Sequence, residues 1–162
     1  MCNLFSRLII PKNVDESERL VRFLLSPMHF KKDNTLRSNV YNPTRGTSEV
    51  SMTRLEYSTA NKCKILAKKI ANNASKPNKQ HTYMGFGLIT KNVALNCGAL
   101  DVVKDSICGN RAHAELILPG TKENVAIASR LQYVQDQLVS NTKVFIDASP
   151  QSSRWDGDVL IY

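Results

Sequence analysis

The sequence lacks any apolar run that approaches the ~18–20 residues needed to cross a bilayer. Its first ten residues contain a single charge and no small-residue cleavage site, so they show no secretory leader pattern. The four cysteines, Cys2, Cys63, Cys97 and Cys108, form no C-x-x-C pair. Free thiols in a reducing compartment fit this spacing, and we expect a cytoplasmic protein with no membrane partner.

Signatures of nucleotide and metal chemistry are also missing. The chain has no G-x-x-x-x-G-K-[ST], G-x-G-x-x-G, H-E-x-x-H or G-x-S-x-G motif. Cys97, Cys108 and His113 carry possible zinc-binding atoms, but their spacing matches no zinc ribbon or finger. The sequence therefore predicts no cofactor and no metal site.

Positive charge is what the chain has in excess. Its 162 residues include 22 Lys and Arg against 14 Asp and Glu, which gives a net charge of +8. The length suits one domain, and 42% hydrophobic residues suffice for a packed core. Because long-range attraction favours polyanions, nucleic acid or an acidic partner protein is the expected partner.

Three segments have the apolar spacing of helices, at 15–26, 59–74 and 121–140. The first opens with Asp15 and Glu18 in a capping-box arrangement and ends before a proline. Lysines border the apolar stripe of the second.

Short apolar or alternating runs between these segments predict strands. The strongest are 82–89 and 112–118, and the glycines at 85 and 87 suggest close approach of another backbone or side chain. Weaker strands are predicted at 3–10, 36–41, 49–55, 100–103, 143–147 and 159–162. Without regular βαβ units, we expect a single-domain α+β fold, with a mainly antiparallel sheet, about three packed helices and a candidate C-terminal extension at 149–162.

Two of the three histidines, His81 and His113, stand at the starts of predicted strands. If those strands pair, both imidazoles reach one cleft, where one could take a 2′-hydroxyl proton and the other protonate the leaving oxygen of a phosphodiester. Arg37 or Arg54 could hold the phosphate. The paired H-x-[ST] motifs of two-histidine phosphoesterases are absent. The alternative is that each histidine is a surface or structural residue.

His113 is the sharper of these two candidates. Residues two apart on a strand share one side, so Arg111 and Glu115 are expected beside His113. Arg111 could supply charge for an anion, and Glu115 could orient the imidazole. The alternative is a buried His113 that bonds a backbone carbonyl in the core.

Other polar and aromatic residues suggest binding surfaces. The turn at 45–48 has the composition of an anion-binding nest, with a plain surface turn as the alternative. The lysines of 62–79 form either a basic face or a solvated helix surface. Trp155, in a late polar loop, is a candidate partner contact or else a core plug. The candidate anion- or nucleic-acid-binding residues are Arg37, Arg45, Arg54, Lys64, Lys68 and Arg111.

Four segments carry a resemblance to known sequences: 36–43 (LRSNVYNP), 49–51 (EVS), 85–87 (GFG) and 113–116 (HAEL). They resemble a widespread set of small bacterial proteins with S-x-x-F-x-P, L-S-V and late H-A-x-I motifs. The similarity covers about residues 36–118, with tyrosine in place of the phenylalanine and VSM at the middle motif. The resemblance implies a bacterial source and a role for His113, and it assigns no reaction.

We therefore expect a basic bacterial binding or regulatory module that engages nucleic acid or a partner protein, in a defence or toxin–antitoxin setting. The alternative is a small, metal-independent, histidine-dependent phosphodiesterase or nucleotide-handling enzyme. A third reading is a structural subunit whose basic face meets an acidic protein. Histidine substitutions separate the first two, and salt dependence separates nucleic acid from an apolar protein interface.

Overall fold

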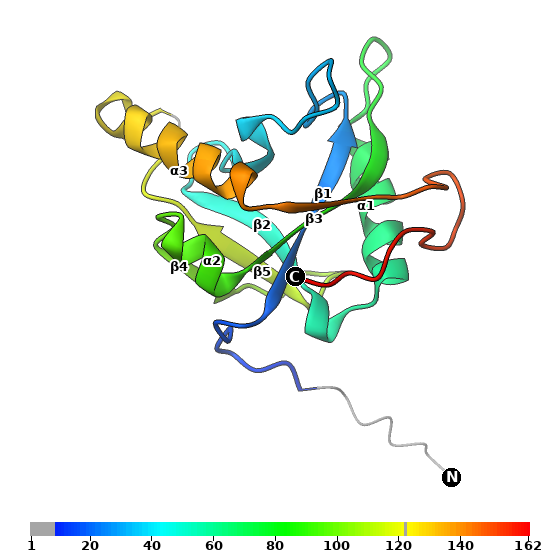
Figure 1. Ribbon diagram of the computed structural model, residues 1–162, viewed down its shortest axis with the longest axis horizontal. Coiled ribbons are helices and arrows are strands. Elements are labelled where there is room, and N and C mark those ends of the chain that lie inside the picture. The colour runs from blue at the N-terminus through cyan, green and yellow to red at the C-terminus, as the bar shows by residue number, and fades with distance from the viewer. Residues whose placement is uncertain (1–8, 122) are drawn as a thin grey trace.

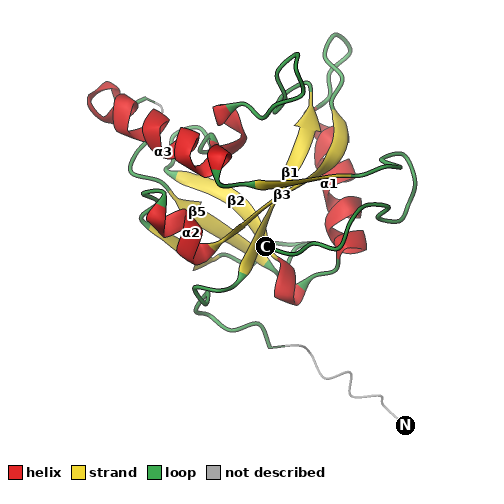
Figure 2. Ribbon diagram, in the orientation of Figure 1, coloured by secondary structure: helices red, strands yellow, loops and turns green. Residues whose placement is uncertain are grey.

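The residues described by the computed structural model, 9–121 and 123–162, form an antiparallel sheet of six strands with helices on both faces (Figures 1 and 2). The strands lie in the order β4-β5-β2-β1-β3-β6. Their bounds are β1 (Arg19–Ser26), β2 (Glu49–Arg54), β3 (Thr82–Thr90), β4 (Asp101–Lys104), β5 (His113–Ile117) and β6 (Lys143–Ile146). This arrangement confirms the predicted α+β class.

The helices α1 and α2 begin at threonines whose side chains accept backbone N–H groups that have no partner within the helix. The Thr59 hydroxyl accepts the backbone N–H of Lys62 at 3.2 Å, and Thr90 accepts that of Val93 at 3.3 Å. The α-helices are α1 (Ala60–Ala74), α2 (Lys91–Asn96) and α3 (Ala128–Ser140). Shorter 3-10 turns occur at Ser38–Tyr41, Leu55–Tyr57 and Val125–Ile127.

The helix predicted at 15–26 is wrong, because most of this segment is the central strand β1. Leu20 and Leu24 enter the core on one face of the sheet, and Val21 and Leu25 enter the core on the other. A strand buried on both faces has a nearly continuous apolar run, which over a short length also matches a helix.

The polar residues before β1 form a turn with one of the two capping-box bonds but no helix. The backbone N–H of Asp15 donates to Glu18 Oε1 at 3.0 Å, and the N–H of Glu18 donates to the Asp15 carbonyl at 3.1 Å. The chain then extends into β1, since both sides of the strand find neighbours in β2 and β3.

Most other predicted elements agree with the structure. The helix predicted at 59–74 is confirmed as α1. The strands predicted at 49–55, 82–89, 100–103, 112–118 and 143–147 are confirmed within one residue at each end as β2 to β6. The sequence pattern did not predict the short helix α2.

Three further predicted segments differ from the structure. Residues 36–41 contain a 3-10 turn in place of a strand, closed by the bond from the Asn42 N–H to the Asn39 carbonyl. The last helix starts at Ala128, later than predicted, and 159–162 form no strand. The strand predicted at 3–10 lies largely outside the described residues.

Each face of the sheet carries its own core. On one face, α2, α3 and the Ser38–Tyr41 turn cover the strands. On the other face, α1 packs against β1 and β3, and residues 149–162 cross beside it. The side chains of β2 and β5 on this second face extend beyond α1, and several of them are polar.

Gly85 and Gly87 of β3 allow the close approach that their sequence spacing predicts. A Cβ at Gly85 would lie 2.1 Å from the Phe145 carbonyl oxygen of β6, and one at Gly87 would lie 2.9 Å from Thr142 Cγ2. The close pairing of the edge strand β6 with β3 therefore depends on glycine at position 85, and Gly87 leaves room for the Thr142 side chain.

Within the described part of the chain, no helix combines the length and the apolar character that crossing a bilayer requires. The thiols of Cys63, Cys97 and Cys108 are free, and Cys2 lies outside the described residues.

Candidate functional site

Polar side chains gather on the part of the sheet beside α1 that the helix leaves uncovered. The strand register places His113 opposite Thr53 and Glu115 opposite Ser51. Asp105 follows β4 and lies across from His113, to whose backbone carbonyl it donates at 3.2 Å. We call this cluster of Ser51, Thr53, Asp105, His113 and Glu115 the open half of the sheet.

His113 is fixed by contacts at both ring nitrogens. Its side chain is only 6% exposed, and Nδ1 lies 2.6 Å from the backbone carbonyl oxygen of Asp105. Because a carbonyl only accepts, Nδ1 carries a proton and donates it. Nε2 lies 3.3 Å from Glu115 Oε1. His113 therefore has features of both predicted alternatives. It is buried and donates a hydrogen bond to a backbone carbonyl, and its other ring nitrogen faces the Glu115 carboxylate.

The Glu115 carboxylate is largely buried and has both a histidine and a second glutamate nearby. Burial raises the pKa of Glu115, the charge of His113 opposes this shift, and the nearby Glu49 adds to it. Ser51 Oγ donates to Oε1 at a long 3.4 Å, and Oε2 is buried without a hydrogen-bond partner. Native structures leave few buried acceptors unpaired, so this oxygen calls for an explanation.

A cavity of about 220 Å³ lies between α1 and the open half. His113 and His29 both line it, together with apolar side chains of α1 such as Ile70. Asn110 forms part of the wall, and its amide donates to Thr53 Oγ1 at 2.9 Å. The histidine that shares a cavity with His113 is therefore His29.

The predicted cleft with His81 and His113 is wrong. β3 and β5 do not pair, because β2 and β1 lie between them in the sheet. His81 lines a different cavity, beside Lys68 and Tyr83, and its Nδ1 is buried without a hydrogen-bond partner.

His29 lies in the loop after β1 and is neutral at ordinary pH. Burial, reinforced by the charge of Arg22, lowers the pKa of His29 to about 3. Its Nδ1 accepts the backbone N–H of Leu25 at 3.1 Å, so the ring proton is on Nε2. The sequence pattern did not single out His29, because it lies in a loop after the predicted helix at 15–26 and stands in no predicted strand.

Two of the predicted anion-binding residues are buried in ion pairs, which corrects their assignment. Arg54 is fully buried and makes two bonds of 2.6 Å to Glu18. Lys64 is fully buried, with Nζ 2.7 Å from Asp147 Oδ2 and 2.7 Å from the Ser149 carbonyl. Neither side chain can reach a phosphate in solution from this position.

The other predicted cations lie at the surface. Arg37 Nε donates to the Phe30 carbonyl at 2.6 Å, and Lys68 Nζ donates to the Gln151 carbonyl at 2.8 Å. Arg111 is exposed in the loop before β5.

Arg45 is exposed in the turn before β2, and the polar groups of that turn bond to one another. The N–H of Thr47 donates to the Thr44 carbonyl at 3.0 Å, and its hydroxyl accepts the N–H of Glu49 at 3.2 Å. The turn thus has the bonding of a plain surface turn.

Trp155 is a plug at the edge of the second core. Its ring stacks on Phe86 with 4.8 Å between centroids, and Nε1 donates to the Asp158 carbonyl at 3.2 Å. This position favours the core-plug alternative over a partner contact.

Exposed lysines line the outer side of α1 and the turn after it. Lys62 and Lys69 are seven residues apart, two helical turns, so they point in nearly the same direction. Within the described residues no salt bridge involves the exposed lysines of this region, and the sequence has no Asp or Glu from residue 57 to 100. We call the set the basic face: Lys62, Lys69, Lys76 and Lys79.

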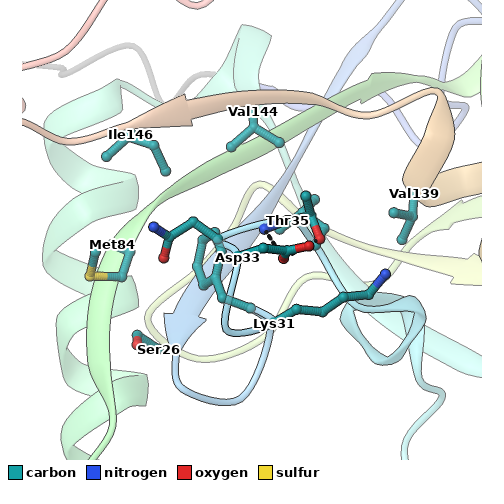
Figure 3. Close-up of a pocket in the computed structure, with 11 residues that line it drawn as sticks. Ser26, Lys31, Asp33, Thr35, Met84, Val139, Val144 and Ile146 are labelled. Atoms are coloured by element: carbon teal, nitrogen blue, oxygen red, sulfur yellow. Dashed lines mark hydrogen bonds between the residues drawn. The ribbon is translucent and has the colours of Figure 1, made fainter.

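A larger cavity, of about 820 Å³, lies away from the predicted site residues (Figure 3). Val144 and Ile146 of β6 line one side, and the loop with Lys31 and Asp33 lines another. Asp33 Oδ1 accepts two bonds from Thr35, at 3.0 and 2.7 Å, and these bonds lower the pKa of Asp33. Asp33 and Thr35 therefore bond to each other within the loop, and no histidine lines the cavity.

Comparison of the chain with protein-family models, with curated proteins and with solved structures found no match. The assignment of a function therefore depends on the residues and their geometry.

Proposed function

We propose that the protein is a basic module that binds nucleic acid through its phosphates, using the basic face. The observation that supports this most is that the exposed lysines of α1 and the turn after it form no ion pair among the described residues, while the sequence has no Asp or Glu from residue 57 to 100. Phosphate contacts dominate the affinity of such proteins and need cations that are free to approach a backbone.

The lysines of α1 divide between two roles according to the side of the helix. Lys64 and Lys68 point toward the C-terminal segment and bind its carbonyl groups and Asp147. Lys62 and Lys69 point away from it and are exposed. Lys64 and Lys68 hold the C-terminal segment beside α1, whereas the charges of Lys62 and Lys69 remain available to a ligand.

The side chain of Ile65 lies between the outward lysines and is 62% exposed. This aliphatic side chain could pack against an unstacked base between the lysines, so we propose single-stranded nucleic acid as the ligand. An acidic protein would also be attracted to this surface, and the experiment below separates the two.

The test is a fluorescence-anisotropy titration of labelled single-stranded DNA and RNA with the full chain. Gln at all four positions of the basic face should weaken binding strongly. A double variant, Lys12→Gln with Arg130→Gln, changes exposed cations elsewhere and should weaken it little. Equal losses in both variants would show that net charge acts without a defined surface. Absence of binding at low salt would refute the proposal and leave the acidic-protein partner.

The open half favours a second candidate, histidine-dependent phosphodiester cleavage. The His113 and Glu115 pair beside a small cavity supports it, because a carboxylate can orient an imidazole that transfers protons. A cleavage assay on single-stranded RNA with His113→Gln tests it, and cleavage by the variant at the wild-type rate would exclude it.

A further inference from the structure

The contact between His113 and Glu115 brings two hydrogen-bond acceptors face to face. The proton on Nδ1 is committed to the Asp105 carbonyl at 2.6 Å, so in the neutral ring Nε2 presents a lone pair. That lone pair lies 3.3 Å from Glu115 Oε1, which also presents lone pairs. Either a proton shared between the two atoms or a metal ion bound to both satisfies this contact.

A third donor lies close to this pair. Asp105, His113 and Glu115 each offer one ligand atom, and the three atoms lie within 4.8 Å of one another. We propose that these residues form a binding site for a divalent transition-metal ion of the Zn²⁺ or Mn²⁺ type. The site is distinct from the basic face and does not depend on the binding of nucleic acid. Because a metal at Nε2 would prevent His113 from transferring protons, this site is an alternative to the histidine-dependent cleavage candidate.

The distances fit two donors on one ion. Zinc binds imidazole nitrogen and carboxylate oxygen at about 2.0–2.2 Å, which places two donors of a tetrahedral site about 3.4 Å apart. The observed 3.3 Å between His113 Nε2 and Glu115 Oε1 is close to that value. Asp105 Oδ2 lies 3.6 Å from His113 Nδ1, on the other side of the ring from Glu115, so its carboxylate would have to turn to reach an ion at Nε2, and its 55% exposure leaves it free to do so.

The surroundings of His113 and Glu115 resemble those of metal ligands. A ligating histidine commonly donates its other ring N–H to a carbonyl or carboxylate, as His113 Nδ1 does here. Ser51 Oγ contacts Glu115 Oε1, and the second carboxylate oxygen is buried without a partner. If Glu115 bound the ion through both carboxylate oxygens, this second oxygen would also gain a partner.

The donor set indicates the kind of ion. One imidazole with two carboxylates suits zinc or manganese better than calcium or magnesium, which are bound mainly through oxygen. Three protein ligands also leave a coordination position for water, as in sites where a metal activates a nucleophile.

The experiment is calorimetric titration of the chelator-treated full chain with ZnCl₂ and with MnCl₂. Wild type should bind one equivalent, and His113→Gln, Glu115→Gln and Asp105→Asn should each weaken binding by roughly tenfold or more. His81→Gln and Asp33→Asn are controls outside the site and should bind as wild type does. Metal should also raise the melting temperature of wild type and not that of Glu115→Gln.

Two results would overturn the proposal. One is absence of binding at millimolar metal. The other is binding that survives Asp105→Asn and Glu115→Gln but is lost in Cys108→Ser, which would place the ion on the exposed thiol. Because Asp105 is exposed, its variant should fold and keep the test decisive even if His113→Gln does not.

Discussion

Asp147 Oδ2 lies 2.7 Å from Lys64 Nζ, and both side chains are fully buried between α1 and the C-terminal segment. The same ammonium donates to the carbonyls of Ser149 and Arg154, at 2.7 and 2.5 Å. One lysine therefore connects the second core to a segment that has no helix or strand of its own.

Replacing Lys64 with alanine should destabilise the protein by about 3–5 kcal/mol, because Asp147 would then be a buried charge without a partner. The matched variant Lys62→Ala, two positions away on the exposed side of α1, should change stability by less than about 0.5 kcal/mol. Urea unfolding of both variants measures the difference. Similar stabilities for the two would contradict the structural role of Lys64.

Gly85→Ala should weaken the pairing of β3 with the edge strand β6. The new Cβ would meet a backbone oxygen, Phe145 O, which cannot move without disturbing the strand pair. Gly46 also has positive φ but nothing within 4 Å of its Cβ position. Gly46→Ala should thus cost only the strain of left-handed backbone, about 1–2 kcal/mol.

Thermal unfolding of the two glycine variants compares how much each substitution destabilises the protein. Gly85→Ala is expected to have the lower melting temperature, with earlier amide exchange in β6. The reverse order would show that β6 does not need the close approach.

His29 should make stability depend on pH below neutrality. Its pKa is about 3 in the folded protein against 6.5 for the free side chain, mainly through burial and then through Arg22 and the nearby His81. Below pH 6.5 the unfolded chain binds a proton that the folded chain does not. Stability from this group is therefore full above pH 6.5 and falls as the pH drops toward 3, by about 2 kcal/mol between pH 7 and 5.

The variant His29→Asn isolates this contribution, because an amide oxygen can still accept the Leu25 N–H. Urea midpoints at pH 7 and pH 5 should differ less in the variant than in wild type. An equal difference in the two proteins would mean that His29 is accessible to protons in the folded state.

Local patterns in the sequence predicted α1 and β2 to β6, because their spacing and their boundary residues are local properties. β1 was misread because a strand buried on both faces has the apolar density of a helix. The glycines of β3 were informative, since only a close neighbour requires two of them in one strand.

The site was harder to predict because it depends on the order of strands. His113 and Glu115 are two residues apart on one strand, so the sequence alone predicts that they point to the same face of the sheet. Asp105 joins them only through the pairing of β4 with β5, and His81 is excluded only because β1 and β2 separate its strand from β5. The burial of Lys64 likewise depends on a segment more than eighty residues away.

The salt dependence of single-stranded DNA binding tests the central proposal most directly. Each phosphate contact contributes about −0.7 to the slope of log affinity against log salt. The variant with Gln at all four positions of the basic face should have a slope shallower by up to about 3, whereas the Lys12→Gln, Arg130→Gln control should keep the slope of wild type. Equal slopes for wild type and the basic-face variant would contradict the account.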